Sequence, residues 1–205
     1  MVSDEILVKR TLNGDLGAYG ELVQRYQDKI FGYAVRMLAP EDARDAAQEV
    51  FIRVFQALPR FDFRAGFDTW LYRVATNLCI DLSRRHARER SRKLPLEACG
   101  VTESLKNVRA GPEEALLQKE RLENLRRAVY ALPEGYKAAL VLHHYQGLSY
   151  RDVAEVTGLS EKTVATRIHR AKLMLKNELL GGDGGALPEG KRTARQISGR
   201  GMPVV

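Results

Sequence analysis

The segment from Gly147 to Lys172 places the strongest constraint on the fold, because its residues have the spacing of two short helices joined by a tight turn. Ser149 is suited to cap the first helix, and Asp152 follows three residues later as an imperfect capping box. Gly158 suits the turn, since glycine adopts the left-handed conformation at a helix end at little cost. Ser160 is suited to cap the second helix. The pattern predicts a helix-turn-helix.

The outward positions of the second helix carry hydrogen-bonding and cationic side chains. Val164 and Ile168 are expected to pack against the first helix, which leaves the polar positions facing solvent. Such side chains read base edges and bind phosphates when a helix enters the major groove of DNA. The candidate DNA-binding residues are Ser160, Lys162, Thr163, Thr166, Arg167, His169, Arg170 and Lys172. The alternative interpretation is a helical hairpin with a solvated basic face.

Apolar residues recur at helical spacing in two blocks of the chain, and the first block shows no strand-like alternation. Residues 94–112 contain two prolines, two glycines and little periodicity. Residues 181–205 are rich in glycine and charge. We therefore predict an all-α chain with two small helical domains at 1–93 and 113–180. We expect a flexible linker at 94–112 and a disordered tail at 181–205.

Composition narrows the possible functions. The 205 residues have a formal net charge of +7, which favours a polyanionic partner. Cys79 and Cys99 lack the spacing of metal ligands, and the histidines do not cluster with acids, so no metal site or cofactor is expected. No apolar run is long enough to span a bilayer, and the first residues lack a signal-peptide core, which predicts a cytoplasmic protein. Without a phosphate loop or nucleophile elbow, we do not expect an enzyme.

Two further motifs in the chain resemble a known family. The segments DARDAAQEVFIRVF from Asp42 and FDTWLYRVATNLCIDLSRR from Phe67 resemble region 2 of bacterial RNA polymerase sigma factors. The segment from Leu132 through Lys172 resembles region 4 of the same family. Two such domains with a short linker are similar to the extracytoplasmic-function (ECF) group. The resemblance implies an alternative sigma factor that joins core RNA polymerase and recognises the −35 and −10 promoter elements. A stand-alone helix-turn-helix transcriptional regulator is the alternative hypothesis.

The helix expected after Pro40 carries a polar and acidic stripe, at helical spacing and opposite Phe51 and Phe55. An acidic stripe on a basic DNA-binding protein is better explained by a protein partner than by nucleic acid. The resemblance implies that this helix binds the coiled coil of the largest polymerase subunit. The candidate core-polymerase-binding residues are Asp42, Asp45, Gln48 and Glu49.

The loop and helix that follow combine aromatic and cationic residues. An unpaired strand is held by pockets of aromatic and backbone groups, with cations on its phosphates. The resemblance places −10 recognition on this loop and on Asn77, while the arginines would hold flanking phosphates. The candidate −10 residues are Phe61, Phe63, Arg64, Asp68, Arg73, Asn77, Arg84 and Arg85.

For the −35 element, the resemblance assigns reading to the second helix of the helix-turn-helix. We expect Arg170 or Arg167 to dominate specificity, because a bidentate arginine on guanine is the strongest specifying contact. Arg167 could instead be satisfied within its own domain. Ala165 stands where many relatives have a cation, which would shift promoter preference or lower affinity. The family also implies an anti-sigma factor as a partner. In the free chain, the two domains either pack together or are clamped by that factor.

Overall fold

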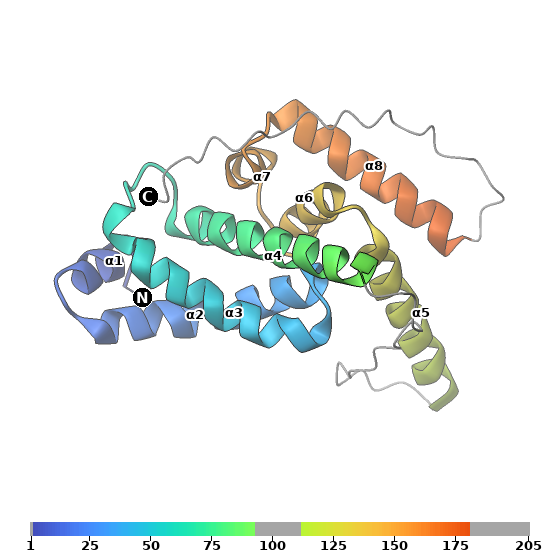
Figure 1. The fold of residues 1–205 in the computed structure, drawn as a ribbon, viewed down its shortest axis with the longest axis horizontal. Coiled ribbons are helices and arrows are strands. Elements are labelled where there is room, and N and C mark those ends of the chain that lie inside the picture. The colour runs from blue at the N-terminus through green and yellow to red at the C-terminus, as the bar shows by residue number, and fades with distance from the viewer. Residues whose placement is uncertain (1, 93–111, 181–205) are drawn as a thin grey trace.

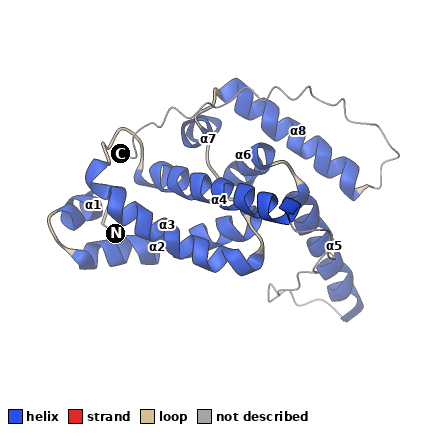
Figure 2. Cartoon of the chain, viewed as in Figure 1, coloured by secondary structure: helices blue, strands red, loops and turns tan. Residues whose placement is uncertain are grey.

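The computed structural model describes residues 2–92 and 112–180. Within these residues the chain is helical and contains no strand, which confirms the predicted all-α class (Figure 2). The helices are α1 (Asp4–Leu12), α2 (Leu16–Met37), α3 (Pro40–Ala57), the short 3-10 helix η1 (Leu58–Arg60), α4 (Phe67–Arg92), α5 (Pro112–Ala131), α6 (Glu134–His144), α7 (Tyr150–Thr157) and α8 (Glu161–Leu179).

The first helical unit, α1 to α4, is built around α2. Tyr33 of α2 is fully buried, and its hydroxyl lies 2.8 Å from the hydroxyl of Thr76 on α4. The face of α3 that packs against it is made of small residues, so the two helices approach closely. The buried residues of α3 are Ala43, Ala46, Ala47, Val50 and Val54. This packing fixes α4, the longest helix, across the middle of the molecule (Figure 1).

The second unit, α5 to α8, is built around α6. Six consecutive residues of α6, from Lys137 to Leu142, are buried, so this short helix is covered on nearly all sides. Helix α6 packs mainly against α8, and it also contacts α2 and α7. Pro112 begins α5, since proline suits the first turn of a helix.

The two units pack directly against each other. In Figure 1, α4 lies between the α2–α3 layer and the layer formed by α6, α7 and α8. Helix α7 contacts α4, and α6 contacts α2. The buried residues of both units form one continuous apolar cluster. Of the two arrangements expected for the free chain, the structure has the one in which the domains pack together.

Two sequence predictions fall largely outside the described residues. The predicted linker at 94–112 lies there except for Pro112, and the predicted tail at 181–205 lies there entirely. The proposed domain boundaries therefore stay predictions.

Candidate nucleic-acid and partner interfaces

The helix-turn-helix forms as the sequence predicts. The backbone N–H of Asp152 donates to the Ser149 hydroxyl at 3.1 Å, and the Asp152 carboxylate accepts from the Ser149 N–H at 3.2 Å, so the capping box is complete. Gly158 ends α7 with a φ of 67°, in the left-handed region. Ser160 caps α8 by accepting from the Thr163 N–H at 3.2 Å. These caps fix the angle between the two helices.

Helix α8 has one buried face and one polar face. Val164, Ile168 and Ala171 are buried, and they orient the helix on the second unit. Ser160 and Thr163 bond to each other through their hydroxyls at 2.8 Å, at the start of the polar face. All the −35 candidates except one are exposed, namely Ser160, Lys162, Thr163, Thr166, His169, Arg170 and Lys172. They lie on α8 or at its N-cap, where they are accessible to a DNA groove.

Arg167 is the exception among these candidates. It is half-buried, and its guanidinium donates to the carbonyl oxygen of Gly135 on α6 at 3.5 Å. A side chain at Gly135 would place its Cβ 2.7 Å from that guanidinium, so glycine makes room for the arginine. This placement corresponds to the structural alternative that the sequence left open, and it leaves Arg170 as the exposed arginine of the pair.

The loop between η1 and α4 holds a stack of aromatic rings. Phe61 is buried, and its ring centroid lies 5.0 Å from that of Trp70 and 4.7 Å from that of Phe63. Phe63 is 36 % exposed and has a φ of 58°, which is uncommon for a bulky residue. Asp62 accepts from the Arg64 N–H at 3.1 Å and fixes the tip of the loop. Phe61 therefore supports the loop from below, and Phe63 presents its ring to solvent.

The remaining −10 candidates point in different directions. Arg64 is almost fully exposed, and Asn77 is exposed on α4. The Asp68 carboxylate accepts from the Thr69 N–H at 2.7 Å, within the first turn of α4. Arg85 lines a groove beside the acids of α3. The eight residues thus form a loop cluster and a dispersed set along α4, rather than one continuous patch.

The acidic stripe on α3 divides between two hollows. Asp42, Asp45 and Glu49 line a groove of about 580 Å³ between α3 and α4. In that groove, Nδ1 of His86 lies 3.1 Å from the Asp42 carboxylate. Gln48 instead lines a hollow of about 450 Å³ between α3 and α2.

The two aromatic residues named opposite this stripe are only partly buried. Phe51 is half-buried and lines the hollow beside Gln48. Phe55 is 42 % exposed, and its ring lies 4.9 Å from that of Tyr19. Small residues of α3 take the central positions instead, because they allow α2 to approach closely.

The histidines do not gather into a ligand set. The rings of His143 and His144 lie 4.8 Å apart, and that of His143 lies 4.6 Å from the Tyr150 ring. Burial lowers the pKa of His144, and the nearby Lys172 and His143 lower it further. Across residues 2–92 and 112–180, no three histidine, cysteine or acidic residues are placed to hold a metal ion. Over the same part of the chain, no helix combines the length and apolarity that crossing a membrane requires.

Comparison with known proteins decides the family. Residues 22–89 match the family model described as Sigma-70 region 2, and residues 122–175 match the model of Sigma-70, region 4. The ECF RNA polymerase sigma-E factor of Haemophilus influenzae is 33 % identical over 186 residues, covering 87 % of this chain and 96 % of the relative. The chain is an ECF sigma factor. It therefore binds core RNA polymerase and directs promoter-specific initiation of transcription.

Other relatives agree with this assignment. The ECF RNA polymerase sigma factor SigW of Bacillus subtilis is 36 % identical over 179 residues, covering 84 % of this chain and 94 % of SigW. The solved structure of CnrH in complex with the cytosolic domain of CnrY matches with a TM-score of 0.64 and 27 % identity, over 88 % of this chain and 99 % of that one. RpoE from Bartonella quintana, solved in complex with the anti-sigma factor NepR, shares the fold with a TM-score of 0.63 and 19 % identity, over 81 % and 98 % of the two chains.

Polar contacts join region 2 to region 4 of this sigma factor. The Tyr72 hydroxyl donates to Oε1 of Gln146 at 2.7 Å, and Arg73 donates to the carbonyl oxygen of Glu155 at 2.8 Å. Nε of Arg84 lies 3.3 Å from the Glu134 carboxylate. Two of the −10 candidates, Arg73 and Arg84, are therefore bonded to region 4 in this arrangement.

Lys137 lies at the centre of the contact between the regions. It is 3 % exposed, and its ammonium donates to the carbonyl oxygens of Met37 at 3.3 Å and Tyr130 at 3.0 Å. Met37 ends α2, so the cation lies at the negative end of that helix dipole. Sequence reasoning missed this residue, because a lysine in the first turn of a helix beside a glutamate has the pattern of a solvent-exposed position.

Proposed function

We propose that this sigma factor uses three separate surfaces. Helix α8 reads the −35 duplex, the loop at residues 61–66 with α4 binds the unpaired −10 strand, and α3 binds core polymerase. The observation that carries the proposal is the polar face of α8, where Lys162, Thr166, His169 and Arg170 are exposed opposite a buried apolar face. A helix with this division enters a major groove without exposing its core.

Arg170 is the residue proposed to set −35 specificity. It is exposed, whereas Arg167 is bonded to the Gly135 carbonyl and supports the domain. A bidentate arginine on guanine discriminates against the wrong base by about 1–3 kcal/mol. Lys162 and Lys172, at the two ends of the same face, are suited to flanking phosphates.

Core polymerase is proposed to bind across both hollows of α3. The hollow beside Gln48 has a mixed lining, in which Phe31 and Phe51 lie beside polar residues, and the neighbouring groove carries Asp42 and Asp45. Apolar and acidic side chains together suit a protein partner, and the resemblance implies that this partner is the coiled coil of the largest subunit. This surface lies on region 2 alone, so it is available whether or not region 4 is docked.

Binding of −10 DNA is proposed to require separation of the two regions. Arg73 and Arg84 contact Glu155 and Glu134 of region 4 in the arrangement described. Separate phosphates of the unpaired strand would replace these two partners. Much of the affinity for DNA should then be phosphate-driven and fall with salt.

An anti-sigma factor is the proposed regulatory partner. The fold that this chain shares with RpoE is the one that NepR binds in the solved complex of those two proteins. We place the protein in the cytoplasm, where core polymerase and promoter DNA are found. It acts as a binding subunit and has no catalytic activity of its own in this proposal.

Reconstituted transcription tests the proposed function. Purified protein and sigma-free core RNA polymerase are mixed with a library of promoter fragments, and start sites are mapped. We expect discrete start sites that appear only when both proteins are present, with an Arg170→Ala variant losing preference at one base pair of the −35 element. DNA binding by the protein alone, without initiation in the presence of core enzyme, would favour the stand-alone regulator instead.

A further inference from the structure

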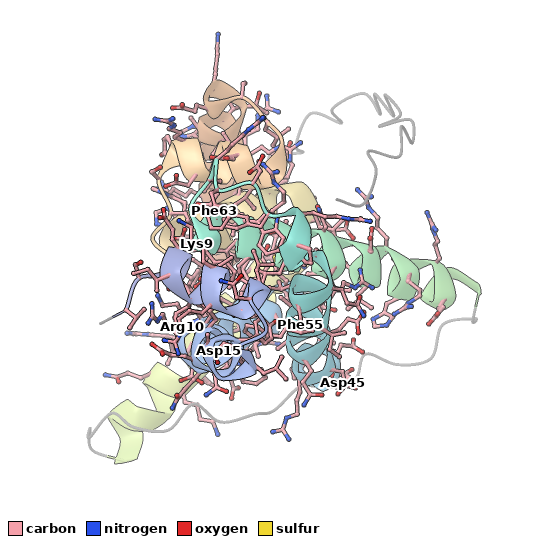
Figure 3. All side chains as sticks on the ribbon, turned by 90° about the vertical axis from the view of Figure 1, so that its left-hand side faces the viewer. Lys9, Arg10, Asp15, Asp45, Phe55 and Phe63 are labelled. Carbon is pink, nitrogen blue, oxygen red and sulfur yellow. The ribbon has the colours of Figure 1, made fainter. Side chains whose placement is uncertain are left out.

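The exposed ring of Phe63 is covered by a cation from a different part of the chain. Nζ of Lys9, on α1, lies 5.5 Å from the centroid of the Phe63 ring. Figure 3 shows Lys9 and Phe63 next to each other, on α1 and on the loop before α4. The N-terminal helix therefore forms one side of the loop that carries the −10 candidates.

The position of Lys9 is fixed by the packing of α1. Leu7 and Val8 are fully buried, and the Asp4 side chain accepts hydrogen bonds from Arg25 and Tyr26 of α2. These contacts hold the backbone of α1 against α2 from both sides of the helix. Lys9 itself is exposed, so its ammonium is presented to solvent from a rigid base.

The charge of Lys9 is also available to bind an anion. Its neighbour Arg10 pairs with Asp15 at 2.7 Å, whereas Lys9 makes no ion pair with any residue in the described part of the chain. Its contact with Phe63 is an exposed cation–π contact, which is worth a factor of only about two to five in an equilibrium constant. The ammonium can therefore exchange the ring for a stronger partner.

The loop presents, at one place, a ring on which a base can stack and cations that can bind its phosphate. Phe63 is held in a left-handed backbone conformation, and strain of this kind clusters at binding sites. Its ring is supported by Phe61, and the next residue, Arg64, is exposed and lies 3.3 Å from the Asp62 carboxylate. An exposed aromatic ring bordered by cations is the combination that single-stranded nucleic acid binds, with bases stacked on the ring and phosphates on the cations.

We infer that Lys9 is a promoter-binding residue, which holds a backbone phosphate of the unpaired −10 strand next to the base stacked on Phe63. The −10 surface thus includes α1 as well as the loop and α4. In the absence of DNA, Lys9 lies over the Phe63 ring, which stays partly exposed. This inference rests on the proposed −10 role of the loop.

The test uses holoenzyme made from the full chain and core RNA polymerase. The DNA is a promoter fragment recovered by the reconstituted transcription, with its −10 region held unpaired by mismatches. Binding is measured over a range of salt concentrations for four variants: Lys9→Met, Lys9→Arg, Arg10→Met and Phe63→Leu. Arg10→Met is the matched control, because Arg10 is the adjacent exposed cation on the same helix and is paired with Asp15 rather than placed over the Phe63 ring.

The salt dependence separates a phosphate contact from a structural role. Lys9→Met should weaken binding and reduce the slope of log affinity against log salt by about 0.7, the value for one phosphate of a single strand. Lys9→Arg and Arg10→Met should keep the wild-type slope. Phe63→Leu should lower affinity about 5- to 150-fold, as expected for one lost base stack, with the slope unchanged.

Two results would overturn the inference. If Lys9→Met keeps the wild-type slope and affinity, Lys9 does not contact the DNA. If it lowers affinity with no change in slope, Lys9 only positions Phe63. Failure of the proposed function would be distinct, since wild-type holoenzyme would then bind the unpaired fragment no better than core enzyme alone.

Discussion

Gln146→Leu is expected to open the contact between regions 2 and 4 without removing any proposed DNA-binding or polymerase-binding residue. Gln146 accepts the hydrogen bond from the Tyr72 hydroxyl at 2.7 Å, across the boundary between the regions. Tyr72 is only 3 % exposed. Leucine fills similar space but offers no acceptor. The Tyr72 hydroxyl would then lack a partner in the packed arrangement, whereas water can bond to it when the regions are separated, so the substitution destabilises only the packed arrangement.

The size of the effect follows from the burial of the two groups. A buried hydroxyl left without a partner costs about 1–3 kcal/mol. Gln146 is half-buried, so water reaches the hydroxyl from that side, and we take about 1–2 kcal/mol as the expected loss. Because 1.4 kcal/mol is a factor of about ten, the equilibrium between packed and separated regions should move about 5- to 30-fold toward separation.

Energy transfer between dyes on the two regions measures this shift. In a chain with Cys99→Ser, the exposed positions Glu5 on α1 and Lys176 on α8 are replaced by cysteine for labelling. Transfer should fall in Gln146→Leu and stay unchanged in Gln118→Leu, an exposed control on α5. If separation frees Arg73 and Arg84 to bind DNA, affinity for an unpaired promoter strand should rise by up to the same factor, since only the separated form can bind the strand.

A second substitution identifies the hydrogen bond as the cause. In a Tyr72→Phe background the hydroxyl is already absent, so Gln146→Leu should have almost no further effect on the energy transfer. The reasoning is refuted if Gln146→Leu leaves transfer unchanged in the wild-type background, or if it lowers transfer equally in both backgrounds.

Three further outcomes are expected. Arg170→Ala should weaken promoter binding by about 1–3 kcal/mol and relax preference at one −35 base pair, while leaving core binding intact in a competition assay. Gln48→Ala combined with Glu49→Ala should weaken competition for core enzyme and leave binding of −35 duplex unchanged. Burial raises the pKa of the Cys79 thiol to about 12, well above the value of about 8.5 for an unfolded chain, so the folded state favours the protonated thiol. The free energy of unfolding should therefore keep the full contribution of this thiol below about pH 8.5, and should fall by up to about 1.4 kcal/mol per pH unit above it. Denaturant titrations of Cys79→Ala should show a smaller fall.

Local signals in the sequence predicted most of the elements. Ser149, Gly158 and Ser160 each act on a backbone group within a few residues, so their roles could be inferred without knowing the rest of the fold. The start of α3 at Pro40 and of α5 at Pro112 were predictable for the same reason. Capping and turn chemistry are local, and they are therefore visible in a single sequence.

Contacts between distant residues could not be predicted in this way. Phe61 and Phe63 have the same side chain two positions apart, yet one supports the loop and the other is exposed at its tip. Which of them faces solvent depends on Trp70 and on the left-handed backbone at Phe63. The docking of Lys137 on the end of α2 likewise requires the two regions to meet, and no spacing in either segment signals it.

Arg73 has two roles in this account, so the effect of replacing it depends on which arrangement of the regions is measured. In the packed arrangement this arginine donates to the Glu155 carbonyl of region 4, and in the proposed function it binds a phosphate of the −10 strand. Arg73→Ala therefore removes a DNA contact and a contact that keeps the DNA-binding form closed. Because apparent affinity scales with the fraction of competent molecules, the second effect offsets part of the first in the free protein. We predict that core polymerase holds the regions apart in holoenzyme and so removes that offset, which should make the loss from Arg73→Ala larger there than in the free chain. Equal losses in the two forms would mean that the Glu155 contact does not restrain region 4.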